Sequence, residues 1–208
     1  MRTLGIPLWA GALCALGLCC ARCSPERTGN TAGTVRLICL DPGHFHAALV
    51  QKYPNARLDS NVYVYAPEGR EVEDYLALVQ SFNSRSERPT AWREHVYRGD
   101  DYLERMLAER PGEAVLLAGN NRHKIDYIER SVAAGLNVLA DKPLVIDPAG
   151  FDRLAKAYEQ AGKQGLMIYD IMTERYDVLN RVQRALMQDT LLFGRLTAGS
   201  DAEPAVSV

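Results

Sequence analysis

Short apolar runs alternate with helix-like segments from residue 35 to residue 189, and this alternation limits the possible folds more than any other feature of the chain. Most of the runs are apolar throughout, as strands of a sheet covered on both faces require. Strands that alternate with helices predict an α/β fold, a doubly wound parallel sheet with right-handed crossovers. The predicted strands are Val35–Leu40, Val62–Tyr65, His95–Tyr97, Ala114–Leu117, Asn137–Ala140 and Leu166–Tyr169.

Helical periodicity fills the intervals between these strands. Val72, Leu76 and Val79 form the apolar stripe of one helix, and Gly135 is placed to cap another at its C-terminus. A sheet of this kind holds its ligand in a crevice at the carboxyl ends of its strands. The predicted helices are Arg70–Ser81, Asp101–Arg110, Lys124–Ala134, a segment that begins at Asp147 and Pro148, and Tyr176–Asp189.

The first 23 residues differ in kind from the rest. Arg2 precedes an apolar run that ends at Arg22, and polar turn residues follow, which is the layout of an export signal. We therefore expect an exported protein, periplasmic or membrane-anchored, in which residues 1–23 are a signal peptide, a lipoprotein signal or a membrane anchor. Residues 24–34 are then a linker, and residues 35–190 are the folded domain.

Four of the five cysteines lie in or just after this apolar run. Zinc binding there is disfavoured, since an apolar membrane segment is a poor metal cage and no histidine follows at ligand spacing. Acylation of Cys19 or Cys20 would make the protein a lipoprotein. The alternative is that the cysteines are merely small apolar residues of a signal that is removed.

The charge balance argues against a nucleic-acid partner. The chain has 24 Lys and Arg against 26 Asp and Glu, a net charge of −2, and its basic residues are scattered rather than clustered. With 47% hydrophobic residues it can bury one ordinary core. We therefore expect a small-molecule ligand and no nucleic acid, with membrane attachment only through the N-terminus, and homo-oligomer formation is left open.

The first predicted turn reads DPGHFH, residues 41–46, and it admits three interpretations. Asp41, His44 and His46 could ligate a metal, but the only later histidines are His95 and His123, so no metal site is predicted. A pyrophosphate turn would use the glycine to let the backbone approach and the following helix N-terminus to attract the anion. The third interpretation is a plain turn with polar residues at a helix entry.

The segment from residue 114 to residue 143 reads AVLLAGNNRHKIDYIERSVAAGLNVLADKP, and it resembles the glucose-fructose oxidoreductase and inositol dehydrogenase family, Gfo/Idh/MocA. The matching features are a loop that ends in His123, a helix that ends in Ala134-Gly135, and Asp141-Lys142-Pro143 after the next strand. The resemblance covers most of residues 35 to 195. It implies a Rossmann-like domain that binds NAD or NADP, in an oxidoreductase that transfers hydride on a sugar or polyol-like substrate.

The resemblance also implies roles for individual residues. The turn after the first strand would lie against the pyrophosphate, the loops after the fourth and fifth strands beside the nicotinamide, and the end of the second strand beside the adenosine ribose. The implied cofactor-binding residues are Gly43, His44, Phe45, Glu68, Asn120, His123 and Asp141; the implied substrate-binding residues are Lys142, Arg175 and Tyr176.

Lys142 is the predicted catalytic residue. An ammonium group held beside Pro143 at the carboxyl end of a strand can hydrogen-bond a substrate hydroxyl and stabilise the charge that develops during hydride transfer. The alternative is a surface lysine that pairs with Asp141, which stands where the family has Glu. Residues 191–208 would begin a second domain that is largely missing, so a noncatalytic nucleotide- or sugar-binding module and an NAD-dependent glycoside hydrolase are kept as alternative functions.

Overall fold

The structure is a computed structural model, and the account of the fold concerns the unit from Gly33 onward. The predicted export segment, residues 1–23, and most of the linker lie outside the described residues. Within the described part of the chain, no helix is both long enough and apolar enough to span a bilayer. The described residues are 33–171, 174–195, 199–200 and 202–203.

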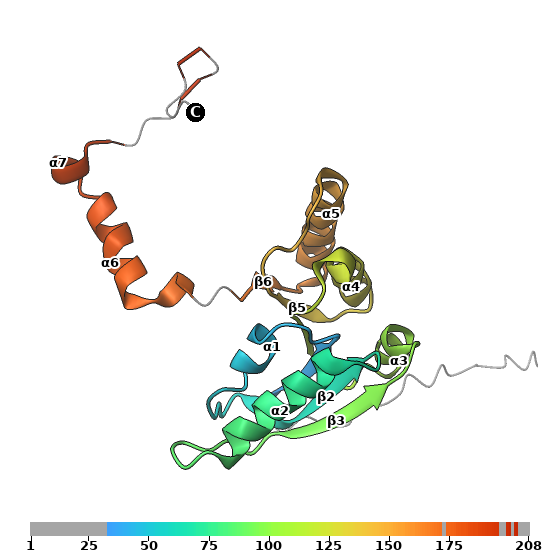
Figure 1. The fold of residues 1–208 in the computed structure, drawn as a ribbon. Coiled ribbons are helices and arrows are strands. Elements are labelled where there is room, and N and C mark those ends of the chain that lie inside the picture. Colours follow the sequence, from blue (N-terminus) through green and yellow to red (C-terminus); the bar gives the residue numbers. More distant parts are fainter. Residues whose placement is uncertain (1–32, 172–173, 196–198, 201, 204–208) are drawn as a thin grey trace, which may run out of the picture. The chain divides into compact units, whose positions relative to one another are not determined.

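Six parallel strands form one sheet, in the order β3-β2-β1-β4-β5-β6 (Figure 1). This order places the first strand in the middle and carries the chain outward twice, once in each direction. The predicted α/β fold with a doubly wound sheet is confirmed. The strands are β1 Val35–Leu40, β2 Leu58–Ala66, β3 Arg93–Arg98, β4 Ala114–Leu117, β5 Asn137–Ala140 and β6 Ile168–Asp170.

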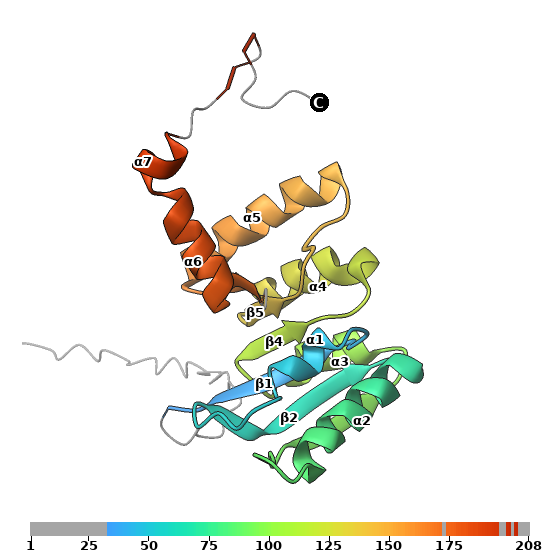
Figure 2. The same cartoon turned by 60° about the vertical axis from the view of Figure 1, so that its left-hand side comes forward.

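Helices cover both faces of the sheet, and the alternation of side chains along β1 shows how (Figures 1 and 2). Leu37 and Cys39 belong to the core cluster shared with α1 and α2, while Ile38 and Leu40 belong to the cluster shared with α3, α4 and α5. Because successive side chains point to opposite faces, a strand buried on both faces must be apolar at every position. The helices are α1 His46–Leu49, α2 Arg70–Ser84, α3 Tyr102–Glu109, α4 Asn121–Ala133 and α5 Pro148–Gln164.

Several element boundaries differ from the prediction, β2 by four residues at its start, and two of the differences have clear local causes. β3 extends beyond His95–Tyr97, because an edge strand has one neighbour only and accepts polar residues that an apolar criterion excludes. α4 begins at Asn121 rather than at Lys124, because the Asn120 side chain caps the helix by accepting a hydrogen bond from the Arg122 N–H.

The last predicted helix, Tyr176–Asp189, is confirmed as α6, which is two residues shorter at each end. A 3₁₀ turn, η1, spans Glu174–Tyr176, and the helix α6 then covers Val178–Met187. The carboxylate of Asp177 accepts from the amides of the first turn of α6, which makes it an N-cap and sets the helix start there. α6 and the short α7, Thr190–Phe193, have no buried residue.

A hydrogen-bonded group around Gln51 joins the segment after α1 to α2 and to β3. Gln51 is fully buried; its Nε2 donates to Glu94 Oε1 at 3.0 Å, its Oε1 accepts from Tyr75 Oη, and its carbonyl accepts from Trp92 Nε1. Burial raises the pKa of the Glu94 carboxyl, against the opposing effect of the Gln51 hydrogen bond. The ionised form of Glu94 is therefore less stable in the folded protein than in water.

Glu94→Gln is expected to raise the free energy of unfolding at pH 7. A carboxyl with a raised folded pKa holds its proton longer in the folded than in the unfolded chain, so wild-type stability falls as pH rises above the ordinary value of 4.5. Glutamine does not titrate and still offers Gln51 an oxygen acceptor. Urea unfolding between pH 4 and pH 7 should show the variant's advantage growing with pH.

Glu159→Gln is the matched control on the exposed surface of α5. Lys163 lowers the pKa of the Glu159 carboxyl, so this change should remove a small stabilisation that is present above pH 4.5, the opposite sign to Glu94→Gln. A stability difference for Glu94→Gln that is unfavourable at pH 7 and independent of pH would contradict the assignment.

Candidate functional site

A cavity of about 660 Å³ opens at the carboxyl ends of β1, β4 and β5. From β1 the chain adds β2 and β3 on one side of the sheet and then β4, β5 and β6 on the other, so the strand order reverses between β1 and β4. Doubly wound sheets bind their ligands at this switch point. The structure brings together residues that the sequence places in three separate turns. Six of the predicted site residues line the cavity: Gly43, His44, Asn120, His123, Asp141 and Lys142.

Glycine residues allow the turns after β1 and β4 to touch. A Cβ added to Gly119 would lie 1.9 Å from the Asp41 carbonyl oxygen, and one added to Gly43 would lie 3.3 Å from the Gly119 Cα. Asp41 has a φ of 48°, in the left-handed region, at the position where a dinucleotide fingerprint has its first glycine. The first turn therefore keeps the backbone shape of a glycine-rich turn although only the middle glycine is present.

The backbone amides of this turn are partly used within the protein. The N–H groups of Gly43 and His44 both donate to the Ala118 carbonyl, at 3.0 and 2.8 Å. α1 has only four residues, so its dipole is too short to attract an anion strongly. The expectation that the N-terminus of this helix attracts the pyrophosphate does not hold for so short a helix, and a dinucleotide would depend more on the side chains of the cavity wall.

A tyrosine pair fixes the Asp41 side chain. Tyr127 Oη donates to Asp41 Oδ2 at 2.8 Å, and the hydroxyl of Tyr102, which lines the cavity, is bonded to that of Tyr127. Burial, followed by the hydrogen bond with Tyr102 and the charge of Asp41, raises the pKa of Tyr127. Tyr127 therefore remains a hydrogen-bond donor at neutral pH and holds a carboxylate at the cavity wall.

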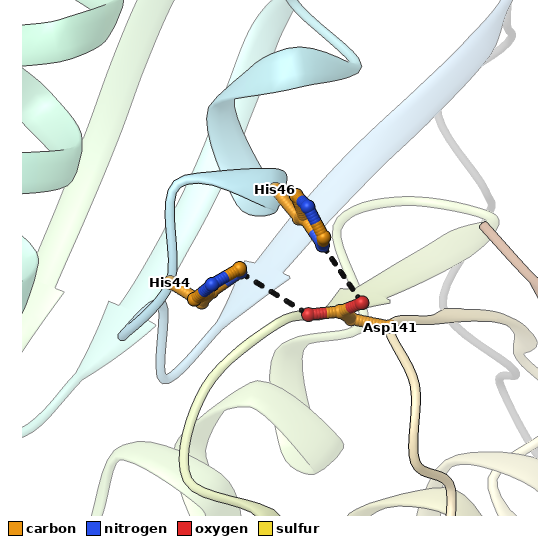
Figure 3. A group of neighbouring side chains, drawn as sticks. All are labelled: His44, His46 and Asp141. Carbon is orange, nitrogen blue, oxygen red and sulfur yellow. Dashed lines mark hydrogen bonds and ion pairs between the residues drawn. The ribbon is translucent and has the colours of Figure 1, made fainter. Parts of the chain in front are cut away.

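His44 and His46 converge on the carboxylate of Asp141 (Figure 3). His46 Nδ1 lies 2.8 Å from Asp141 Oδ1, and His44 Nδ1 lies 3.3 Å from Asp141 Oδ2. Asp141 is buried, and its Oδ1 also accepts from the Lys142 N–H at 2.7 Å. Burial, together with repulsion from His46, lowers the pKa of His44. The imidazole of His44 is therefore neutral at pH 7 and faces the cavity.

Lys124 is a fully buried lysine behind the cavity. Its Nζ donates to Asn121 Oδ1 at 2.7 Å and to the Asp141 carbonyl at 2.8 Å, so it ties the first turn of α4 to the end of β5. Burial lowers the pKa of its ammonium group, while the charge of Asp141 opposes this effect. The lysine holds the loop of Asp141 and Lys142 in place.

The Lys142 side chain is exposed and lines the cavity beside Pro143. The alternative interpretation, in which its ammonium pairs with Asp141, is not what the structure shows, because the Asp141 carboxylate is bonded to two imidazoles and to the Lys142 backbone. In the described part of the chain the Lys142 ammonium makes no ion pair within 4.0 Å. It is available to a ligand in the cavity.

Comparison with known families agrees with this arrangement. The profile of an oxidoreductase family with an NAD-binding Rossmann fold, Gfo/Idh/MocA, matches residues 40–169, which is more than half of the chain and includes every turn of the cavity. The chain belongs to the Gfo/Idh/MocA family. Its folded domain is thus of the NAD-binding Rossmann type, and NAD or NADP is its cofactor class, as the resemblance implied.

Solved structures include several relatives of the domain. An oxidoreductase from Parabacteroides merdae is 49% identical, with a TM-score of 0.77 over 83% of this chain and 39% of that one. A myo-inositol dehydrogenase from Sinorhizobium meliloti is 18% identical, with a TM-score of 0.53 over 76% of this chain and 42% of that one. The latter likeness shows the fold alone.

A biliverdin reductase from Synechocystis, solved with biliverdin and NADP+, is 15% identical, with a TM-score of 0.52 over 74% of this chain and 42% of that one. It too shows the fold alone. This chain thus spans about two fifths of the length of each of these three structures. No curated protein matches the chain.

Four residues that the Gfo/Idh/MocA resemblance implied are not among those lining the cavity. Phe45 borders a separate hollow of about 270 Å³ over α2, and Glu68, after β2, lies 3.5 Å from Arg98 in an ion pair. The Tyr176 hydroxyl is bonded to that of Tyr169 at 2.6 Å. The Arg175 side chain lies outside the described residues, as do Met172 and Thr173.

Sequence reasoning missed Glu71, Tyr102 and Asn121, which line the cavity, and Lys124, which is buried behind it. Lys124 carried a signal, because it lies four residues before Ile128 and so shares the buried face of its helix. A lysine on the apolar stripe of a helix must have partners, which indicates a structural or functional site. Tyr102 and Asn121 gave no such signal, since each stands at a polar helix start.

Proposed function

We propose that this chain carries the dinucleotide-binding half of the site of an NAD(P)-dependent oxidoreductase that acts on a sugar or polyol-like substrate. The observation that supports it most is the cavity at the switch point, where Gly43, Asn120 and Lys142 meet from three turns. The family match supports the cofactor class. The substrate class rests on the resemblance, and the S. meliloti relative is described as a myo-inositol dehydrogenase.

The residues of the cavity fit a dinucleotide. Gly43 and Gly119 have no side chain that would fill the space between the two turns in which they lie. The cavity volume lies in the range of ligand sites. His44 and His123 add polar rings, and Lys142 adds a cation. These groups would hold the cofactor from its pyrophosphate to its nicotinamide.

Lys142 is proposed as the catalytic residue. The dinucleotide supplies hydride transfer, and the Lys142 ammonium would donate a hydrogen bond to the substrate oxygen whose charge changes during that transfer. Buried Asp141 and Lys124 hold the backbone from which Lys142 projects. The backbone that carries this side chain is therefore fixed at the cavity rim.

We also propose that the protein is exported and is periplasmic or membrane-anchored, as a lipoprotein if Cys19 or Cys20 is acylated. The support is the layout of residues 1–23, a positive residue, an apolar run and a polar stop. Mass spectrometry of the native protein tests this proposal. Intact Met1 on a protein recovered from the cytoplasm would contradict it. Self-association into a homo-oligomer remains a prediction.

Titration of NADH and NADPH fluorescence with the purified chain tests the dinucleotide site. Gly43→Val is expected to weaken binding about tenfold or more, because even a Cβ there would lie 3.3 Å from the Gly119 Cα and the branched side chain would enter the cavity. Comparison of the two cofactors also tests whether the carboxylate of Glu68, paired with Arg98, favours NAD.

Gly162→Val is the matched control. Gly162 lies on α5 with nothing within 4 Å of an added Cβ, so its variant should bind the cofactor as wild type does. Thermal unfolding of both variants separates lost binding from lost folding. Wild-type protein that binds neither cofactor, or a folded Gly43→Val protein that binds as tightly as wild type, would refute the site.

A further inference from the structure

Three metal-ligating side chains converge at the base of the cavity (Figure 3). His44 and His46 come from the turn after β1 and the start of α1, and Asp141 follows β5, 95 residues beyond His46. One ligand atom from each lies within 4.8 Å of the others. Two imidazole nitrogens and one carboxylate oxygen form a ligand set that divalent transition metals use in proteins.

The spacing of these atoms suits a common metal ion. Ligands about 2.0–2.2 Å from a tetrahedral zinc ion lie roughly 3.3 Å from one another. The Nδ1 atom of His44 lies at this separation from the Asp141 carboxylate, 3.3 Å, and that of His46 lies closer, at 2.8 Å. Small side-chain movements would therefore convert the hydrogen-bonded cluster into a coordination shell.

The cluster is closed on one side and open on the other. The side chains of Asp141 and His46 are 6% and 12% exposed, whereas that of His44 is 42% exposed and lines the cavity. Structural metal sites are closed by four protein ligands, while catalytic sites have three and keep a position for water or substrate. This set has the catalytic pattern.

Hydrogen bonds from neighbouring groups hold Asp141 in place. The Asp141 carboxylate accepts from the Lys142 N–H, and the Asp141 carbonyl accepts from Lys124 Nζ, so both ends of this residue are fixed. Two ammonium groups nearby, those of Lys124 and Lys142, reduce the attraction for a cation. Two imidazoles and a single carboxylate, beside these two cations, favour a metal held by tight coordination bonds, such as zinc, over calcium or magnesium, which take mainly oxygen ligands.

We propose that His44, His46 and Asp141 bind a divalent transition metal of the zinc class, with an open coordination position facing the cavity. The metal would polarise an oxygen of the substrate beside Lys142. The sequence alone offered Asp41 and not Asp141 as the third ligand, because Asp141 belongs to a distant turn and is brought to the histidines only by the pairing of β1 with β4 and of β4 with β5. Metal binding does not depend on the dinucleotide function, whereas the role in polarising the substrate rests on the proposed oxidoreductase function.

Titration of the untagged full chain with Co²⁺, under reducing conditions and without dinucleotide, tests the proposal. We expect saturable visible absorption at about one metal per chain, displaced by Zn²⁺. Asp141→Asn and His46→Ala should each weaken Co²⁺ binding at least about tenfold. His44→Ala changes the most exposed ligand, so it gives a folded test protein if the two buried substitutions fail to fold.

His95→Ala is the matched control, since His95 is exposed on β3 and bonded to Asn61. It should bind Co²⁺ as wild type does. Absent or unsaturable binding by wild type, equal binding by folded His44→Ala protein, or a spectrum dominated by thiolate charge transfer, which would place the metal on cysteines, would each overturn the proposal. Because the measurement uses no NAD or NADP, failure of the dinucleotide site leaves its result interpretable.

Discussion

Gly119→Ala is expected to lower the melting temperature by about 6–12 °C, from a loss of about 3 kcal/mol in a domain of this size. The added methyl would lie 1.9 Å from the Asp41 carbonyl oxygen, a contact that neither backbone can accept without moving. The turns after β1 and β4 would separate, so the cavity between them should also lose its shape. Thermal unfolding and NADH titration of the same protein measure both effects.

Gly162→Ala is the control for this substitution. Gly162 lies within α5, its added Cβ meets nothing within 4 Å, and alanine favours a helix over glycine by about 0.5–1 kcal/mol. The two substitutions make the same chemical change and should shift the melting temperature in opposite directions. Equal melting temperatures for Gly119→Ala and wild type would mean that the turns after β1 and β4 do not touch.

Lys142→Ala is expected to lower kcat about a hundredfold while dinucleotide affinity changes only a few-fold. A charged donor aimed at a developing charge contributes on the order of 3 kcal/mol to the transition state and much less to cofactor binding. Lys142 projects from the loop after β5 into the cavity, whereas the turns of Gly43 and Gly119 shape its other wall. Kinetics of a form of the protein that also carries the substrate-binding half of the site, on a sugar or polyol found by screening with NAD and NADP, together with cofactor titrations, would measure the two effects.

Lys156→Ala is the matched control, because Lys156 is exposed on α5 and does not line the cavity. Lys142→Arg separates charge from shape, since it keeps a cation but presents a planar group with different donor directions. We expect it to recover part of the lost rate. Turnover that is unchanged in Lys142→Ala would assign the chemistry to another residue, and a loss confined to cofactor affinity would make Lys142 a binding residue.

Much of the fold could be predicted from local patterns. β1, β4 and β5 were predicted to the residue, because strands buried on both faces are mostly apolar and stand out from their surroundings. β3 was predicted too short, since its polar residues reflect an edge position that local sequence does not reveal. The start of α6 after Asp177 was predicted two residues early, although an aspartate that caps a helix is a readable signal.

The sequence predicted several of the residues that line the cavity, but not which of their side chains contact one another. The turns after β1, β4 and β5 had to lie near one another once the sheet was doubly wound, and six predicted residues do line one cavity. The convergence of His44 and His46 on Asp141 was not foreseen, because the metal interpretation looked for a further histidine and overlooked a carboxylate in a distant turn. A motif predicted that Lys142 lies at the cavity. Only the structure shows that its ammonium group does not pair with Asp141, whose carboxylate accepts from the Lys142 backbone N–H instead.

Local sequence patterns suffice to predict the succession of strands and helices, the parallel sheet that this succession requires, and the residues that stand at the carboxyl ends of the strands. Those properties follow from hydrophobic period and turn chemistry, which act over a few residues. Only the tertiary structure decided which of those residues touch: that Gly119 meets Asp41, that Lys124 is buried beneath Asp141, and that two histidines share one carboxylate. Such contacts depend on strand order and register, which are set by the packing of both faces of the sheet and not by any single segment.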